Sequence, residues 1–274
     1  MTSTITLTDA SERLGVHYMT AYRYVRTGRL AAHKDGGQWR VASEDLEHFS
    51  SDDTPRLPRQ QSTPPRLAER LIAGDENGSV TLLEDAQSGG ADLMEVYLEL
   101  IGPALVTIGQ QWQTGQLSIA DEHVASATAL RVVSRLGSRM ASRGRSRGTI
   151  ILATIPNDYH SLPTAMLRDL LRYRGFDVVD LGANTPADSI VERSNVVGDD
   201  LLAVGLASST PGSDDIARDA LLTLNKKLDV PIIMGGGAFA CIDQIESLGN
   251  CVPSLSARHA LQIFDEVHER ARSR

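Results

Sequence analysis

The 274-residue sequence is poor in cysteine and has no long apolar run. Cys241 and Cys251 are its only cysteines, and their spacing fits neither a disulfide framework nor a zinc site. No stretch approaches the roughly 18 consecutive apolar residues of a membrane span, so we expect no membrane partner. The first ten residues, MTSTITLTDA, lack the basic start and apolar stretch of a secretory signal. We therefore expect a cytoplasmic protein.

Charge is distributed unevenly along the chain. The net charge is −8 at pH 7, yet five basic and no acidic residues lie between Arg13 and Lys34. This local excess suits a nucleic-acid partner even though the whole chain is acidic. A proline-rich stretch interrupts the sequence after this segment. We expect a DNA-binding domain at 1–50, a linker at 51–65, a helical domain at 66–147 and an α/β domain at 148–274.

The N-terminal segment reads as helix, turn, helix and wing. Thr8 is a suitable N-cap for the first helix, and Gly15 supplies the turn between the two helices. A two-stranded wing with its tip at Asp35-Gly36-Gly37 follows. The expected elements are helices at Asp9–Leu14 and Tyr18–Thr27, a wing at Leu30–Val41 and a helix at Ser43–Phe49.

The second helix carries the hydrogen-bonding and cationic side chains that groove reading and phosphate anchoring require. The candidates on this helix are Tyr18, Thr20, Arg23, Tyr24 and Arg26. The wing adds Lys34, Gln38 and Arg40 as candidate DNA contacts. An interaction module whose arginines form a solvated face is the alternative interpretation.

Residues 7–49 resemble the excisionase-type and MerR-type winged helix-turn-helix over nearly their whole length. The resemblance implies that the helix with Thr20, Arg23 and Tyr24 enters the major groove of double-stranded DNA. One such unit offers few phosphate contacts, so binding at physiological salt calls for two or more copies. We therefore expect a homodimer or homotetramer.

The middle of the chain predicts a four-helix bundle. Apolar residues at helical spacing begin at Leu67, and further helices are expected over Gly78–Ala86, Ala91–Gln110 and Ser118–Met140. Ser118 and Asp121 form a capping box, which places Glu122 and His123 in the first turns of the last helix. His123 shares a stripe with apolar residues and is expected on the buried face, where a core histidine is an alternative to a functional one.

Trp112, nine further residues and Glu122-His123 together resemble the W-x9-E-H signature of B12-dependent transcriptional regulators. The resemblance implies that the tryptophan covers the upper face of a corrin and that the Glu-His pair flanks the upper cobalt ligand. Trp112 as plain core is the alternative. Light-sensing members carry a histidine after the tryptophan, where this chain has Gln113. An amide is a poor cobalt ligand, so a bis-histidine photoproduct is not expected.

The C-terminal segment alternates short β-rich runs with helical stretches, which predicts a flavodoxin-like doubly wound parallel sheet. The expected strands are Thr149–Thr154, Val178–Leu181, Leu201–Gly205, Pro231–Met234 and Cys251–Val252. Sheets of this kind bind ligands beyond the carboxyl ends of their strands. The loops after the first, third and fourth strands are therefore the expected site.

The loop after the first strand holds Asp158 and His160, two residues apart. A surface histidine is the ordinary interpretation, but a carboxylate at this distance can accept the second ring N–H and fix the tautomer of a metal-bound imidazole. The stretch resembles the D-x-H-x-x-G motif of cobalamin-binding domains. The resemblance implies that His160 displaces the dimethylbenzimidazole tail and becomes the lower cobalt ligand. Pro163 stands where that motif has glycine.

The two later loops resemble the same domains. Ser208 and Ser209 are candidates for the pocket of the nucleotide tail, although Ala207 occupies the position of the usual first serine. Gly235 and Gly236 match a glycine turn whose missing side chains let the tail pack against backbone. The segment Leu181–Pro186, LGANTP, also recurs in these domains.

Together the sequence predicts a multidomain α and α/β protein that senses adenosylcobalamin or methylcobalamin and binds a DNA operator. We expect a regulator, not an enzyme. A corrinoid methyl-carrier protein is one alternative. The other is a regulator whose B12-like domain has lost cobalamin or binds another ligand, which Gln113, Pro163 and Ala207 keep open.

Overall fold

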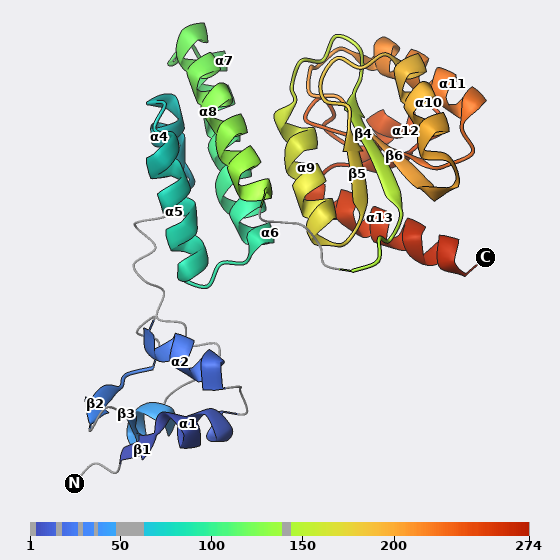
Figure 1. The fold of residues 1–274 in the computed structure, drawn as a ribbon. Helices are drawn as coiled ribbons and strands as arrows, with labels where there is room; N and C mark the ends of the chain where they lie inside the picture. The colour runs from blue at the N-terminus through green and yellow to red at the C-terminus, as the bar shows by residue number, and fades with distance from the viewer. Residues whose placement is uncertain are drawn as a thin grey trace. The chain divides into compact units, whose positions relative to one another are not determined.

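The computed structural model describes residues 4–14, 18–26, 30–35, 38–47, 63–138 and 144–273, without the side chains of Met19, Thr20, Arg23, Arg26 and Glu47. The chain forms two compact units, residues 1–63 with 82–92 and residues 64–81 with 93–274. Figure 1 shows the small N-terminal module, the long helices and the α/β domain as successive parts of the chain. Within the described residues, no helix is long and apolar enough to cross a bilayer.

The N-terminal module combines helices with a three-stranded antiparallel sheet of order β1-β3-β2. Its elements are β1 Thr4–Thr6, α1 Leu7–Arg13, α2 Tyr18–Arg26, β2 His33–Asp35, β3 Gln38–Ala42 and α3 Ser43–Glu47. The predicted helices and wing are present, whereas β1 was not expected. It pairs Ile5 with Val41 and so anchors the start of the chain to the wing. The expected turns at Gly15 and Gly36-Gly37 and the helix ends at Thr27 and Phe49 lie outside the described residues.

The cap of the first helix is Thr6, so the prediction of Thr8 was wrong. The Thr6 hydroxyl accepts a hydrogen bond from the Asp9 backbone N–H at 3.1 Å, and the Asp9 carboxylate accepts from the Thr6 N–H at 3.2 Å. These bonds lower the pKa of Asp9. The helix begins earlier than expected because Leu7 belongs to the core of the module, together with Ala10 and Val41.

Four long helical stretches follow. Their elements are α4 Pro64–Ile72, α5 Glu76–Ser88, α6 Leu93–Glu95, the π-helix η1 Val96–Ile101, α7 Gly102–Gln113 and α8 Ile119–Gly137. Residues 51–62 of the expected linker lie outside the described residues, and its last part already belongs to α4. The π-helical turn was not predicted, since its residues keep the apolar pattern of an ordinary helix.

The buried face of α8 differs from the predicted one. The capping box of Ser118 and Asp121 is present, but the core residues include Ala125, Ala129 and Val132. Ile119 is 63% exposed, and the side chain of His123 is 75% exposed. The prediction of a buried His123 was wrong. It assumed that the large apolar residue Ile119 marks the buried face of the helix, whereas small residues such as Ala125 and Ala129 form much of that face.

The C-terminal domain is a five-stranded parallel sheet of order β5-β4-β6-β7-β8, as the sequence predicted. The strands are β4 Thr149–Thr154, β5 Asp177–Asp180, β6 Leu201–Ala207, β7 Ile232–Gly235 and β8 Val252–Ser254. The helices are α9 Leu162–Tyr173, α10 Ala187–Val197, the 3₁₀ turn η2 Gly198–Asp200, α11 Asp214–Lys227, α12 Ile242–Glu246 and α13 Ala257–Arg272.

Helices cover both faces of this sheet, which explains why its central strands are apolar throughout. α9 and α13 pack on one face, and α10 and α11 pack on the other over a continuous core (Figure 1). The strand order reverses beside β4, because β5 lies on one side of it and β6 on the other. The loops after β4 and β6 therefore meet at the switch point where such sheets bind ligands.

A buried hydrogen bond joins the helical region to the α/β domain. Tyr97 of η1 donates its hydroxyl to Asp169 of α9 at 2.9 Å, and both side chains are fully buried. Arg168 donates to the same carboxylate at 2.9 Å. Burial and the Asp169 charge raise the pKa of Tyr97 well above its ordinary value. The hydroxyl therefore remains a donor at any physiological pH.

Candidate functional site

The loop after β4 is fixed by hydrogen bonds from Thr154, at the end of β4, and from Asn184, in the loop after β5. The Thr154 hydroxyl donates to the Asp158 carbonyl at 2.6 Å, and the Asn184 N–H donates to the same carbonyl at 2.7 Å. The Asn184 side-chain oxygen accepts from the Asn157 N–H at 2.8 Å. Both asparagines have positive φ, 65° and 53°, a region that asparagine tolerates better than most residues. The loop is thus fixed before any ligand arrives.

Asp158 is the centre of this arrangement. Its side chain is 1% exposed, and one carboxylate oxygen lies 2.7 Å from His160 Nδ1 and accepts from the His160 N–H at 3.1 Å. The other oxygen accepts from the Ser209 N–H in the loop after β6. The expected contact between Asp158 and His160 is therefore present. Because a carboxylate can only accept, it fixes the proton on Nδ1 and leaves the Nε2 lone pair free.

His160 presents this lone pair outward, since its side chain is 60% exposed. An imidazole held in one tautomer by a buried carboxylate is the usual form of a histidine that ligates a metal. The geometry can therefore supply one nitrogen ligand at the carboxyl end of the sheet. The part of the chain that the structure describes adds no cluster of three metal-binding side chains.

The loop after β6 places its two serines differently. Ser208 is fully buried, and its hydroxyl bonds the Ser213 hydroxyl at 2.7 Å. The Ser209 hydroxyl oxygen is also buried, yet it has no hydrogen-bond partner. An unpaired buried hydroxyl costs free energy in the unliganded protein. Ser209 is therefore the better candidate for a ligand contact.

Gly235, the last residue of β7, and Gly236 after it lie so close to neighbouring backbone that a side chain would not fit. A Cβ at Gly235 would lie 2.4 Å from the Ser254 carbonyl oxygen. A Cβ at Gly236 would lie 2.1 Å from the Ser208 carbonyl oxygen, and its φ of +119° is also unfavourable for other residues. Gly237 has open space around it. The predicted glycine turn is thus packed directly against the loop of the two serines.

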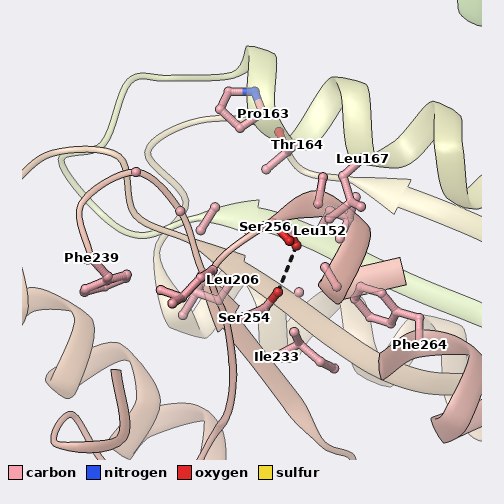
Figure 2. Close-up of a pocket in the computed structure, with 18 residues that line it drawn as sticks. Leu152, Pro163, Thr164, Leu167, Leu206, Ile233, Phe239, Ser254, Ser256 and Phe264 are labelled. Atoms are coloured by element: carbon pink, nitrogen blue, oxygen red, sulfur yellow. Dashed lines mark hydrogen bonds between the residues drawn. The ribbon is translucent and has the colours of Figure 1, made fainter. Parts of the chain in front are cut away.

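These loops open onto a mainly apolar cavity of about 300 Å³ between α9, α13 and the sheet. Figure 2 shows Leu167, Leu206, Ile233 and Phe264 among its walls, with Pro163 at one end. The full lining is Leu152, Pro163, Thr164, Leu167, Gly205, Leu206, Ala207, Ile233, Gly235, Gly236, Gly237, Phe239, Ser254, Leu255, Ser256, Ala257, Ala260 and Phe264. A cavity of this size lies at the lower end of the range for small-molecule sites.

The second acid–histidine pair is built loosely. His123 Nε2 lies 3.7 Å from a Glu122 carboxylate oxygen, beyond hydrogen-bond distance. The other Glu122 oxygen accepts from Ser126, one turn further along α8. Trp112, at the end of α7, is 46% exposed, so its interpretation as plain core was wrong. Gln113 beside it is exposed as well.

The candidate DNA residues lie on α2 and the two wing strands. Tyr18 is 41% exposed and stacks on Tyr22, whereas Tyr24 is half-buried and packs against the module core. The helix also holds Thr20, Arg23 and Arg26, whose side chains lie outside the described residues. Exposed Lys34 lies over the Trp39 ring, and Gln38 is exposed on β3. Arg40 is half-buried, and its Nε is buried without a partner.

Sequence reasoning missed two residues that support the site, Thr154 and Asn184. Thr154 ends the first expected strand, and Asn184 lies three residues after the second, in a loop that was not expected to belong to the site. The segment Leu181–Pro186 was noted only as a recurring sequence, but its asparagine is what fixes the His160 loop. A polar residue closing an otherwise apolar strand was the available signal for Thr154.

The residues present fit a corrinoid with its nucleotide tail. His160 offers the nitrogen, Asp158 orients it, and the cavity beside Pro163 offers an apolar chamber at the same end of the sheet. Pro163 and Ala207, which depart from the motifs, line this chamber without closing it. The Ser209 hydroxyl has no hydrogen-bond partner in the protein, so a polar atom of the ligand could bond it.

Comparison with family models gives three matches along the chain. Residues 4–50 match a helix-turn-helix domain, and residues 65–136 and 148–262 match two models of a B12 binding domain. The monomethylamine corrinoid protein of Methanosarcina barkeri shares the fold, with a TM-score of 0.65, 17% identity and coverage of 76% of this chain and 99% of that one.

Curated relatives include corrinoid proteins and a transcriptional repressor. The trimethylamine corrinoid protein 1 of Methanosarcina acetivorans is 27% identical over 180 residues, which cover 64% of this chain and 82% of the relative. The HTH-type transcriptional repressor CarH of Myxococcus xanthus is 30% identical over 148 residues, 53% of this chain and 48% of the relative. The chain therefore carries a two-part cobalamin-binding region behind an N-terminal helix-turn-helix domain.

Proposed function

We propose that this protein is a transcriptional regulator whose binding to double-stranded DNA is controlled by cobalamin. The observation that carries the proposal is the presence of a helix-turn-helix domain, residues 4–50, on the same chain as the cobalamin-binding region. Similarity to the repressor CarH supports it. The chain's role is sensing and not catalysis, since the DNA-binding module has no part in methyl-group chemistry.

Within the α/β domain, His160 Nε2 is the nitrogen that would bind the cobalt of the cofactor. Asp158 orients the ring by accepting a hydrogen bond from Nδ1–H, and Ser209 and Asn184 keep Asp158 in place. Bound adenosylcobalamin or methylcobalamin supplies a cobalt ion with a labile upper carbon ligand. On the helical side, exposed Trp112 offers a flat apolar surface to exclude water from that ligand.

We expect regulation to act through assembly. A single winged helix-turn-helix makes few phosphate contacts, so a homodimer or homotetramer would bind DNA far more tightly than one copy. Cobalamin can shift this equilibrium only by its differential affinity for the assembled and unassembled forms. Exposed apolar side chains of α7 and α8, among them Val106, Ile119 and Val124, are candidates for the surface whose association cobalamin would change.

The second candidate is a corrinoid methyl-carrier protein. Similarity to the trimethylamine corrinoid proteins favours it, and that similarity covers more of this chain than the similarity to CarH. It leaves residues 4–50 without a role. A DNA-binding measurement therefore separates the two candidates.

The experiment uses the full-length chain, first freed of cofactor. Duplexes selected from a random-sequence pool provide a DNA target, and mass by light scattering is measured with and without adenosylcobalamin in the dark. We expect selected DNA, a change in mass with the cofactor, and loss of DNA binding in the variant R23A/R26A. Failure to select any duplex, with cobalamin still bound, would leave the carrier function as the better account.

A further inference from the structure

We propose that Asp169 is a positioning residue whose buried carboxylate sets the tilt of a helix pair, η1–α7 and α8, on the α/β domain. Through this tilt it determines where Trp112 and Glu122 lie relative to His160. The first part of the proposal depends only on the contacts of Asp169. The second part rests on the cobalamin binding proposed above, because it concerns the residues assigned to that cofactor.

The two oxygens of the Asp169 carboxylate are engaged by different elements. Oδ1 accepts a hydrogen bond from Arg168 Nε at 2.9 Å and lies 2.9 Å from Arg168 Nη2, both within α9. Oδ2 accepts from the Tyr97 hydroxyl of η1 at 2.9 Å. Asp169 and Tyr97 are fully buried, so loss of this bond would leave a charged oxygen short of a donor away from water. The contact between η1 and α9 is therefore held to the geometry of one hydrogen bond.

The backbone of α8 lies against the same carboxylate. A Cβ at Gly137, the last residue of α8, would lie 2.2 Å from Asp169 Oδ2 and 2.5 Å from its Cγ. Glycine permits this approach because it has no Cβ to collide with the charged group. Three helical elements, η1, α8 and α9, thus meet at one buried side chain.

Arg168 connects this junction to the sheet. Its Nη1 lies 3.7 Å from Asp180 Oδ2, at the end of β5. Apolar packing between helices is non-directional, whereas hydrogen bonds to a charged group have a defined geometry. The junction can therefore fix an orientation, which burial of apolar surface alone does not.

The two helices that meet at this carboxylate carry the candidate cofactor residues at their far ends. Trp112 follows Tyr97 by fifteen residues along the unbroken run of η1 and α7. Glu122 precedes Gly137 by the same fifteen residues along α8. Fifteen helical residues span about 20 Å, so a tilt of about 10° at the junction would displace either far end by about 4 Å. Because α7 and α8 also pack on each other, such a tilt would move both candidates together.

The first measurement is the placement of the helix pair in the full-length protein without cofactor. One spin label is attached to Q110C, at an exposed position of α7, and the other to native Cys241, which is exposed in the α/β domain. C251S in every variant prevents labelling of the second cysteine. Pulsed electron paramagnetic resonance then gives the distribution of distances between the two labels.

A pair of glycine variants tests the junction. G137A should shift or broaden the distance distribution, because its methyl group meets Asp169 Oδ2. G109A is the matched control, since Gly109 also lies in a helix but has nothing within 4 Å of its Cβ. Its distribution should equal that of the unchanged protein. Y97F, which removes one bond and adds no clash, should broaden the distribution less than G137A. Distributions of G137A and Y97F that both coincide with that of G109A would overturn the proposal.

The second measurement is cobalamin affinity. We expect G137A to bind adenosylcobalamin about tenfold more weakly in the dark than G109A does, because only the correctly placed fraction of molecules offers the complete site. The absorption features of nitrogen ligation by His160 should persist in the cobalamin that G137A binds, which general unfolding would abolish. A displaced helix pair with undiminished affinity would overturn the role of Asp169 at the cofactor site. Absence of cobalamin binding in the unchanged protein would overturn the cofactor proposal, while the distances would still decide whether Asp169 sets the tilt.

Discussion

Two acid–histidine pairs of this chain, Asp158 with His160 and Glu122 with His123, differ in how firmly the carboxylate is held. In the pair Asp158 and His160, the carboxylate is 1% exposed and accepts three hydrogen bonds, two of them from backbone N–H groups. In the pair Glu122 and His123, the carboxylate is 26% exposed, accepts one hydrogen bond from Ser126, and lies 3.7 Å from His123 Nε2. The first pair is therefore joined by hydrogen bonds, whereas the second is not.

The difference shows how a common residue pair acquires a defined function. Neighbouring residues on one helix face solvent independently, because residues i and i+1 point in different directions. The Asp158 backbone carbonyl instead accepts hydrogen bonds from Thr154 and Asn184. These bonds fix the backbone, so the Asp158 carboxylate stays directed at His160. We therefore assign the geometrically demanding task, ligation of cobalt, to the first pair. The second pair is suited to an adaptable contact with the upper ligand.

The largest expected effect is that of H160A. Removing the ligating nitrogen should weaken cobalamin binding by more than about 100-fold, beyond what loss of a supporting residue costs. The absorption spectrum of bound cobalamin should also lose the features of nitrogen ligation from the protein. Spectral titration checks both. H123A is the matched control, and equal losses in the two variants would remove the distinction between the pairs.

Next in size is the effect of D158N. The amide nitrogen would face the N–H of Ser209 or His160, so at least one of the three bonds is lost and His160 is no longer confined to one tautomer. We expect cobalamin affinity to fall by about 10- to 100-fold, as for other residues that orient a metal ligand. E122Q should change it by less than about threefold, since Glu122 makes no hydrogen bond to exposed His123, 3.7 Å away. An affinity for D158N within that smaller range would contradict the account.

Substitution of Gly236 should lower the stability of the fold by a free energy similar to the loss in binding expected for D158N. G236A places a methyl group 2.1 Å from the Ser208 carbonyl oxygen at a φ of +119°, and should lower the free energy of unfolding by about 2 kcal/mol. Denaturant unfolding of the protein without cofactor measures it. G237A, where nothing lies within 4 Å, should cost less than about 0.5 kcal/mol. Similar values for the two would show that the turn relaxes, and the site would then be less rigid than we describe.

The smallest expected effect is that of Y97F. It removes one hydrogen bond to buried Asp169 and keeps the ring in place, so we expect a loss of about 1 kcal/mol in unfolding free energy. Arg168 still donates to that carboxylate and limits the loss. The same unfolding measurement serves here. A loss above about 3 kcal/mol would indicate that the bond between the helical region and the α/β domain carries more of the stability than one neutral donor normally does.

The sequence predicted most of the fold because its patterns are local. Parallel strands, the wing strands and the capping box of Ser118 follow from alternation, apolar runs and cap residues, and each is present. The strand β1 was not predictable in this way, since three residues form it only by pairing with β3. The exposure of His123 was missed because small residues such as Ala125 and Ala129 form the buried face.

Prediction of the site was similarly divided. The spacing of Asp158 and His160 is a local property, so their contact could be expected from sequence. The bonds from Asn184 and Ser209 join residues far apart in the chain, and only the fold brings them together. The same holds for Gly236, because the Ser208 carbonyl that excludes a side chain there lies far away in the sequence.

The central claim is that cobalamin at His160 controls DNA binding by residues 4–50. The most direct measurement is the affinity of the full-length protein for a selected duplex, with and without adenosylcobalamin in the dark, in the unchanged protein and in H160A. We predict a change of about 5- to 150-fold in the unchanged protein, the usual range of coupling between two sites, and none in H160A. Equal affinity with and without cobalamin in the unchanged protein, while cobalamin is bound, would contradict it.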